Sequence, residues 1–82
     1  MLSAILHPSF AKVLSKIRDN STKERIYKLL AKIQKNPEIG KPMKYERKGT
    51  REVYISPFRL SYAYLKEENK IIFLDLYHKN MQ

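Results

Sequence analysis

The stretch REVYISPFRLSY, residues 51–62, decides the predicted fold. Its first half alternates Val53 and Ile55 with Glu52 and Tyr54, which is the period of a strand with one buried face. The central proline breaks this run before a second alternating run begins, a pattern typical of two strands joined by a turn. The expected strands cover residues 51–56 and 58–65. Because neighbouring side chains on a strand point to opposite faces, we expect Val53 and Ile55 to face a helical layer, with Glu52 and Tyr54 on the other face.

The residues before this hairpin predict two amphipathic helices, the first opening at Ser9. Apolar side chains recur at helical spacing in two runs, Phe10, Val13, Leu14 and Ile17, then Ile26, Leu29, Leu30 and Ile33. Ser21 and Glu24 match a capping box, in which each side chain satisfies a backbone donor at the start of the second helix. Asn36-Pro37 ends that helix. Two such helices in tandem predict a helical hairpin.

The remaining short apolar runs predict further strands. These are expected at residues 2–6, 42–47 and 70–77. Consecutive strands joined by tight turns run antiparallel, and alternation along one strand places Leu60, Tyr62 and Tyr64 in the core. The predicted fold class is therefore α+β, a single domain over residues 1–82. A short N-terminal strand and the helical hairpin are expected to pack on one face of an antiparallel β-sheet.

Length and composition narrow the chemistry. A chain of 82 residues builds one hydrophobic core. It has no cysteine and only two histidines, His7 and His78, which argues against a disulfide framework or a structural zinc site, so we expect no metal or other cofactor. The sequence lacks a signal-peptide pattern, and no run reaches the roughly 20 apolar residues of a membrane span. We therefore expect a cytoplasmic protein.

The net charge of +9 is concentrated in the middle of the chain. Residues 23–51 contain ten basic and three acidic side chains. Such an excess favours an anionic partner, with nucleic acid ahead of acidic protein and membrane surface. The lysines of the second predicted helix fit either a solvated surface or a contact with a polyanion.

Three strings resemble the RelE/ParE toxin superfamily in their order and spacing. They are Gly40-Lys41-Pro42-Met43-Lys44, residues 51–62, and Leu76-Tyr77-His78-Lys79. With the helical hairpin before them, they extend the resemblance over nearly the whole chain. It implies a RelE-like fold and a toxin held in check by a cognate RelB-like antitoxin, acidic and partly helical, in a toxin–antitoxin hetero-oligomer. In the nuclease branch of the superfamily, the implied activity is metal-independent cleavage of messenger RNA at the ribosome, which inhibits translation.

The resemblance also implies catalytic roles for Arg59, His78 and Lys79. In that branch the ribose 2′-hydroxyl of the RNA is the nucleophile, so the protein has to supply a base, a cation and an acid. Arg59 suits the phosphate because its planar fork binds two oxygens at once. His78 titrates near neutrality and suits proton transfer, while Lys79 would bind phosphate or protonate the departing oxygen. We expect Arg59 and His78 to lie together on the polar face of the sheet.

Further residues suit RNA binding. Lys44, Arg47, Lys48 and Arg51 are candidates for phosphate contacts, and the ring of Tyr54 is a candidate for stacking on a base. Glu52 and Tyr54 stand where the RelE branch carries basic residues, and Glu52 is an alternative carboxylate base. His7, beside Pro8, is expected to be structural.

Two other functions fit the same resemblance. One is a ParE-type toxin that poisons DNA gyrase without cutting nucleic acid. The other is an inactive relic that binds RNA or its antitoxin. Arg59 and His78 favour the nuclease, whereas Glu52 and Tyr54 depart from its pattern.

Overall fold

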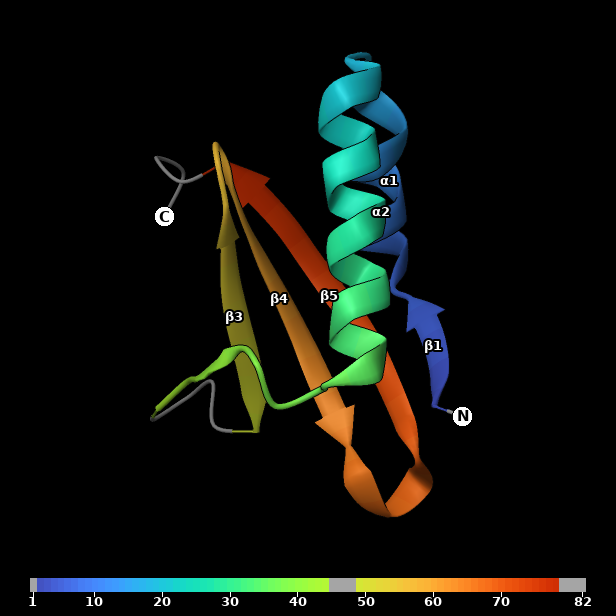
Figure 1. Cartoon of the computed structure of the whole chain (residues 1–82), viewed down its shortest axis with the longest axis vertical. Helices are drawn as coiled ribbons and strands as arrows, with labels where there is room; N and C mark the ends of the chain where they lie inside the picture. The colour runs from blue at the N-terminus through green and yellow to red at the C-terminus, as the bar shows by residue number, and fades with distance from the viewer. Residues whose placement is uncertain (1, 45–48, 79–82) are drawn as a thin grey trace.

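Two helices lie on one face of a five-stranded sheet in the computed structural model, which describes residues 2–44 and 49–78 (Figure 1). The strand order is β1-β5-β4-β3-β2. In chain order the elements are β1 (Ser3–Leu6), α1 (Pro8–Lys16), α2 (Asn20–Lys35), β2 (Lys41–Pro42), β3 (Thr50–Ile55), β4 (Phe58–Leu65), the 3₁₀ turn η2 (Lys66–Glu68) and β5 (Lys70–His78). The predicted α+β class, with its helical hairpin, is confirmed.

The N-terminal strand makes the sheet mixed rather than antiparallel throughout. β3, β4 and β5 form an antiparallel meander, but β1 pairs parallel with β5, with Ser3 opposite Lys70. The antiparallel expectation came from tight turns between consecutive strands. β1 is separated from β5 by both helices and the meander, so no tight turn sets its direction. It forms an edge of the sheet, where Ile5 and Leu6 remain exposed.

α1 begins one residue earlier than predicted, at Pro8. Its cap is His7, whose Nδ1 accepts a hydrogen bond from the backbone N–H of Ser9 at 3.1 Å. Proline suits the first helical position because the N–H it lacks would have no intrahelical partner there. The structural role predicted for His7 is therefore confirmed. Among the described residues, no helix has the length and apolar character needed to cross a membrane.

α2 begins at a cap that the sequence pattern did not indicate. The carboxylate of Asp19 accepts hydrogen bonds from the Thr22 hydroxyl at 2.6 Å and from the backbone N–H of Ser21 at 3.3 Å. The bond from Thr22, ahead of those from the backbone, holds the pKa of Asp19 below its usual value. The predicted capping box of Ser21 and Glu24 is wrong, because Asp19 is the last extended residue and Ser21 already lies in the helix.

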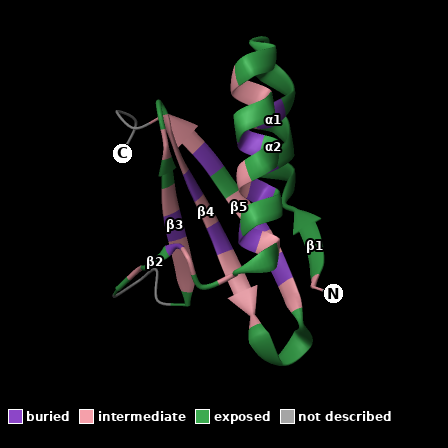
Figure 2. Ribbon diagram, viewed as in Figure 1, coloured by how far each residue is buried: buried purple, intermediate pink, exposed green. Residues whose placement is uncertain are grey.

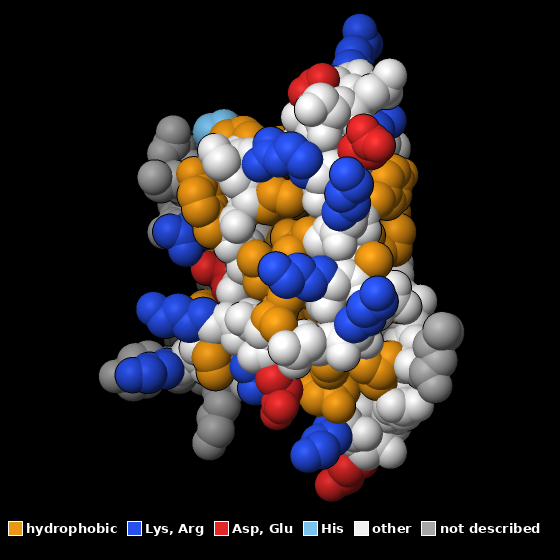
Figure 3. Space-filling view, in the orientation of Figure 1, with side chains coloured by type: hydrophobic (Ala, Val, Ile, Leu, Met, Phe, Trp, Pro, Cys, Tyr) orange, Lys and Arg blue, Asp and Glu red, His pale blue; other side chains and the backbone are white. Residues whose placement is uncertain are grey.

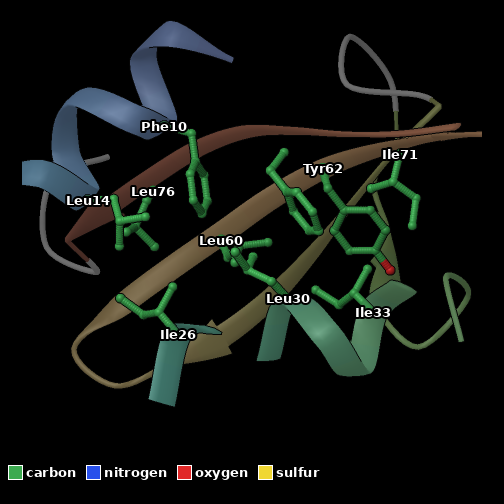
Figure 4. Close-up of a cluster of buried hydrophobic side chains, with 10 residues drawn as sticks. Phe10, Leu14, Ile26, Leu30, Ile33, Leu60, Tyr62, Ile71 and Leu76 are labelled. Carbon is green, nitrogen blue, oxygen red and sulfur yellow. The ribbon is translucent and has the colours of Figure 1, made fainter. Parts of the chain in front are cut away.

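The core lies between the helices and the sheet (Figures 2 and 4). Its buried side chains are Phe10, Leu14, Ile26, Leu30, Ile33, Leu60, Tyr62, Ile71, Phe73 and Leu76. Burying one large apolar side chain contributes roughly 1.5 to 3 kcal/mol, so this cluster is the main stabilising term. Leu60 and Tyr62 are buried as predicted, and Tyr64 packs against the cluster while partly exposed.

A β-bulge in β5 decides which of its side chains face the helices. The register pairs on either side of the bulge are Ser61 opposite Asp75 and Tyr62 opposite Phe73. Leu74 is therefore an extra residue on β5. The alternation of faces changes phase at this point, so Leu76 follows Phe73 into the core after three positions instead of two.

The sheet face opposite the helices carries a different set of residues, which we call the far face. It comprises Thr50, Glu52, Tyr54, Arg59, Ser61, Asp75 and Tyr77, together with Lys41, Ala63, Leu65, Lys70 and Ile72. These assignments follow from the register, because residues directly opposite each other share a face and neighbours along a strand do not. Polar and aromatic side chains thus gather on this face, as predicted for Glu52 and Tyr54.

The strand predicted at 42–47 is tested only as far as residue 44, and of residues 42–44 only Pro42 lies in a strand, β2. It covers Lys41–Pro42, and residues 45–48 lie outside the described part of the chain. After β2, the backbone N–H of Met43 donates to the carbonyl of Thr50 at 3.0 Å. This bond brings Met43 next to the start of β3.

The buried hydroxyl of Tyr62 ties the segment between α2 and β2 to the sheet. It donates to the carbonyl of Pro37 at 2.7 Å and accepts from the backbone N–H of Gly40 at 3.0 Å. Burial raises the pKa of this phenol. A Cβ at Gly40 would lie 2.7 Å from the Tyr62 hydroxyl and 3.0 Å from the Cβ of Arg51, so only glycine fits there. Sheet and connecting segment are therefore locked together at this point.

We predict that Tyr62→Phe destabilises the protein by about 1 to 3 kcal/mol, because the substitution leaves a backbone donor and acceptor without their partner. Urea denaturation measures the change. Tyr64→Phe is the matched control, since its hydroxyl makes no hydrogen bond within the described residues, and it should change stability by less than about 0.5 kcal/mol. Equal losses of stability in the two variants would contradict a stabilising role for the hydrogen bonds of the Tyr62 hydroxyl.

Candidate functional site

Glu52, Arg59 and Tyr77 form a hydrogen-bonded network on the far face. Nη1 of Arg59 lies 3.0 Å from Oε1 of Glu52, and the Tyr77 hydroxyl donates to Oε2 of the same carboxylate. The three side chains come from β3, β4 and β5, so the network spans the three strands of the meander. A base candidate, a cation and a phenol therefore meet at one place.

The strand register builds this network. Arg59 on β4 lies opposite Tyr54 on β3 and opposite Tyr77 on β5, which places all three on the far face. Glu52 lies two residues before Tyr54 on β3 and so shares this face. Tyr54, with 53% of its surface exposed, flanks Arg59 as a solvent-facing ring.

Burial of Glu52 strengthens its interactions with Arg59 and Tyr77. Glu52 is only 9% exposed, and a buried carboxylate is costly unless hydrogen bonds and an opposite charge compensate it. Arg59 and Tyr77 supply that compensation, one to each oxygen. The Arg59 side chain is still 34% exposed, although its Nε is buried and has no hydrogen-bond partner within residues 2–44 and 49–78. Its guanidinium is thus held by Glu52 on one side and accessible to an incoming anion.

A hollow of about 230 Å³ adjoins the network. Its lining consists of Met43, Thr50, Ser61, Leu74, Asp75 and Tyr77. Tyr77 belongs to both the hollow and the network. Asp75 is exposed and forms no hydrogen bond or ion pair with another residue in the part of the chain that the structure describes.

The structure separates Arg59 from His78. His78 lies opposite Phe58, and the two rings meet edge to face with centroids 5.9 Å apart. Phe58 packs against the core cluster, so His78 is on the helical side of the sheet while Arg59 is on the far face. The expectation that Arg59 and His78 share the polar face is therefore wrong. The bulge at Leu74 is the physical reason, because it reverses the alternation of β5 before His78.

The residues predicted to bind RNA also separate. Arg51 faces the helical side, where its Nη1 donates to the carbonyls of Glu38 at 3.0 Å and Gly40 at 2.8 Å. These bonds give Arg51 a structural role on the helical side, and its phosphate contact stays a prediction. Lys44 is exposed, as is Tyr54 on the far face.

The other predicted positions, Arg47, Lys48 and Lys79, lie outside the described residues.

Two residues of the site were missed by reasoning from sequence. Reasoning from the sequence assigns Tyr77 no role in the site, and it gives Asp75 only that of an alternative ion-pair partner for Arg59. Tyr77 adjoins the Tyr77-His78-Lys79 string, so the signal was present, but its face depends on the bulge.

Cations dominate the opposite side of the molecule. The basic residues of α2 are Lys23, Arg25, Lys28, Lys32 and Lys35, and Glu24 is the single acidic residue of that helix. Figure 3 shows Lys and Arg side chains spread over the helical side. The helical side therefore carries an excess of cations, whereas the far face mixes Lys41, Arg59 and Lys70 with the carboxylates of Glu52 and Asp75.

Comparison with known proteins bears on this site. A family model described as ParE toxin of the type II toxin–antitoxin system, parDE, matches residues 4–82. A sequence comparison with curated proteins gave no significant match.

Solved structures share the fold. The chain is similar to a chain of the intact E. coli RelBE toxin–antitoxin complex, with a TM-score of 0.83 at 15% identity, covering 98% of this chain and 99% of that one. The RelBE2 toxin–antitoxin complex from Mycobacterium tuberculosis gives a TM-score of 0.83 at 19% identity, covering 95% and 98%. The YoeB dimer from Staphylococcus aureus gives 0.74 at 23% identity, covering 94% and 97%. At these identities the likeness establishes the fold alone.

We predict that Glu52 and Arg59 are energetically coupled. Arg59→Ala removes the cation that pairs with a nearly buried carboxylate, so it should destabilise the parent by about 1.5 to 3 kcal/mol. In a Glu52→Gln background the same substitution should cost less, because no buried charge is left without its cation. A double-mutant cycle in urea measures the difference. Additive losses would contradict the coupling.

Proposed function

The chain belongs to the ParE toxin family of type II toxin–antitoxin systems, and on this premise we propose that it is a metal-independent endoribonuclease that cuts messenger RNA and inhibits translation. The observation that carries the proposal is the Glu52–Arg59–Tyr77 network on the far face. It unites a carboxylate, a guanidinium and a phenol, the three kinds of group that cleavage by the RNA's own 2′-hydroxyl requires.

The proposed reaction begins when a phosphate of the RNA reaches Arg59. The phosphate competes with Glu52 for the guanidinium and frees the carboxylate to accept the proton of the 2′-hydroxyl. The 2′-oxygen attacks the phosphorus, and Arg59 stabilises the charge that grows on the phosphoryl oxygens. The bond to the 5′-oxygen breaks as Tyr77 donates its proton to that oxygen.

The products are a 2′,3′-cyclic phosphate and a 5′-hydroxyl. Glu52 then carries one proton more and Tyr77 one proton fewer than at the start. The direct hydrogen bond between them returns the proton and restores the site. In this proposal Tyr77, rather than His78, supplies the acid, because His78 is on the other side of the sheet.

Other predicted residues retain a place in this proposal. Lys44, Arg47 and Lys48 contact phosphates along the strand, Tyr54 stacks on a base beside Arg59, and Lys79 contributes charge near the end of β5. The RNA is messenger RNA on the ribosome, in the cytoplasm. Arg51 is left out because two backbone carbonyls hold it on the helical side.

A ParE-type poison of DNA gyrase is the second candidate. The match to a ParE family model favours it, as does the pairing of Arg59 with a carboxylate in place of a second cation. Such a toxin would act by binding, so the network would then serve stability alone.

We predict that Glu52→Gln, Arg59→Ala and Tyr77→Phe each reduce messenger-RNA cleavage by roughly 10²- to 10⁴-fold, while Arg59→Lys loses less because it keeps the charge. Cleavage is measured in a translation extract, with cut sites mapped by primer extension and folding checked by thermal unfolding. His78→Ala is the control and should stay within a few-fold of the parent.

Full cleavage by folded Glu52 and Arg59 variants would contradict the nuclease proposal. Inhibition of gyrase supercoiling by a parent that cuts no RNA would favour the ParE-type candidate. Loss of cleavage in His78→Ala but not in Tyr77→Phe would return the acid role to His78.

We also propose that an acidic, partly helical antitoxin binds over the helical hairpin and forms a hetero-oligomer with the toxin. Family membership implies an antitoxin, and the charge argues for the location, because α2 carries five basic residues against one acidic residue. Charge complementarity of this kind speeds association and opposes binding of wrong partners.

We predict that reversing two exposed charges of α2, Lys28→Glu with Lys32→Glu, weakens binding of the neighbouring-gene antitoxin by roughly tenfold or more at low salt. Titration of purified antitoxin at two salt concentrations measures the change. Lys66→Glu, on the exposed turn η2, is the control and should bind as the parent does. An unchanged affinity in the double variant would place the antitoxin elsewhere.

A further inference from the structure

We propose that the hollow beside Tyr77 is a nucleobase pocket that selects guanine next to the cut. This inference rests on the proposed nuclease function and names the part of the substrate that its site reads. The hollow measures about 230 Å³, which suits one planar base and falls below the roughly 300 Å³ at which pockets for drug-sized ligands begin.

Tyr77 connects the pocket to the chemistry. Its hydroxyl bonds to Glu52 in the network, and the same residue lines the hollow. A base in the hollow therefore belongs to a nucleotide that flanks the phosphate held at Arg59. Proteins that recognise single-stranded RNA commonly bind unstacked bases through their hydrogen-bonding edges in this way.

The lining supplies both apolar walls and a hydrogen-bonding end. Met43 and the bulge residue Leu74 contribute apolar surface, while Ser61 and Asp75 lie opposite each other across β4 and β5. The carboxylate of Asp75 has no hydrogen-bond partner among the described residues, so a ligand need not displace one of them to reach it.

A carboxylate favours guanine over the other bases. Its two oxygens only accept hydrogen bonds, and guanine alone presents two adjacent donors, N1–H and the N2 amino group, on its Watson–Crick edge. Adenine and cytosine each place a ring acceptor beside their amino group, and this acceptor would face a carboxylate oxygen unfavourably. Uracil offers one donor between two carbonyl acceptors.

The experiment uses a messenger RNA with a randomised window, cut by the purified toxin both free and in a translation extract, with the ends sequenced. The parent should prefer RNA with guanine at one fixed position beside the scissile phosphate. Its cleavage rate there should exceed that with adenine by on the order of 10- to 100-fold, the discrimination expected of a good bidentate contact. Inosine, which lacks the N2 amino group, should fall between guanine and adenine.

Asp75→Asn is the decisive variant. It keeps the shape of the side chain but turns one acceptor into a donor, so the preference should move from guanine to bases with an adjacent donor and acceptor, adenine above all. Asp75→Ala should lose the preference for guanine over adenine at that position. Glu67→Gln, an exposed carboxylate on η2, is the matched control and should keep the parental preference.

The outcomes separate the inference from the function on which it rests. Cleavage by the parent with no preference at that position, or a preference unaltered in folded Asp75→Asn, overturns the guanine pocket and leaves the nuclease proposal intact. Absence of cleavage by the parent in both settings overturns both proposals.

Discussion

The extra residue in β5, Leu74, is the constraint on which the rest of the structure depends. It changes the phase of a strand that already placed Ile71 and Phe73 in the core, so Leu76 continues the core and Tyr77 turns to the far face. Without this bulge, simple alternation would bury Tyr77 and expose Leu76 on the far face. One inserted residue thus completes both the hydrophobic layer and the polar network.

The core and the site are joined through the connecting segment between α2 and β2. The hydroxyl of Tyr62 holds this segment at Pro37 and Gly40, and Arg51 binds its carbonyls from the neighbouring strand. These hydrogen bonds fix the position of the segment that continues into β2. After β2, Met43 lies at the hollow on the far face. Packing on the helical side therefore shapes a surface on the opposite side.

Charge is distributed unevenly over the two sides of the molecule. The half-buried Arg59 pairs with Glu52 on the far face, while the excess of cations over α2 remains exposed. In the proposed function, the long-range field of a protein with net charge +9 attracts the RNA strand, and short-range hydrogen bonds on the far face position it. An acidic partner on the helices would reduce that field without touching the network.

The sequence by itself determined the α+β class, the helical hairpin, the alternation of Glu52 with Val53 and the burial of Leu60 and Tyr62, because these follow from local periodicity. It also made Arg59 a candidate for the site, because the string that contains it resembles a known superfamily. Only the tertiary structure decided that Arg59 meets Tyr77 rather than His78, and that β1 runs parallel to β5. The physical reason is that a register shift and the pairing of distant strands arise from contacts between segments far apart in the chain, which leave no periodic signal in either segment alone.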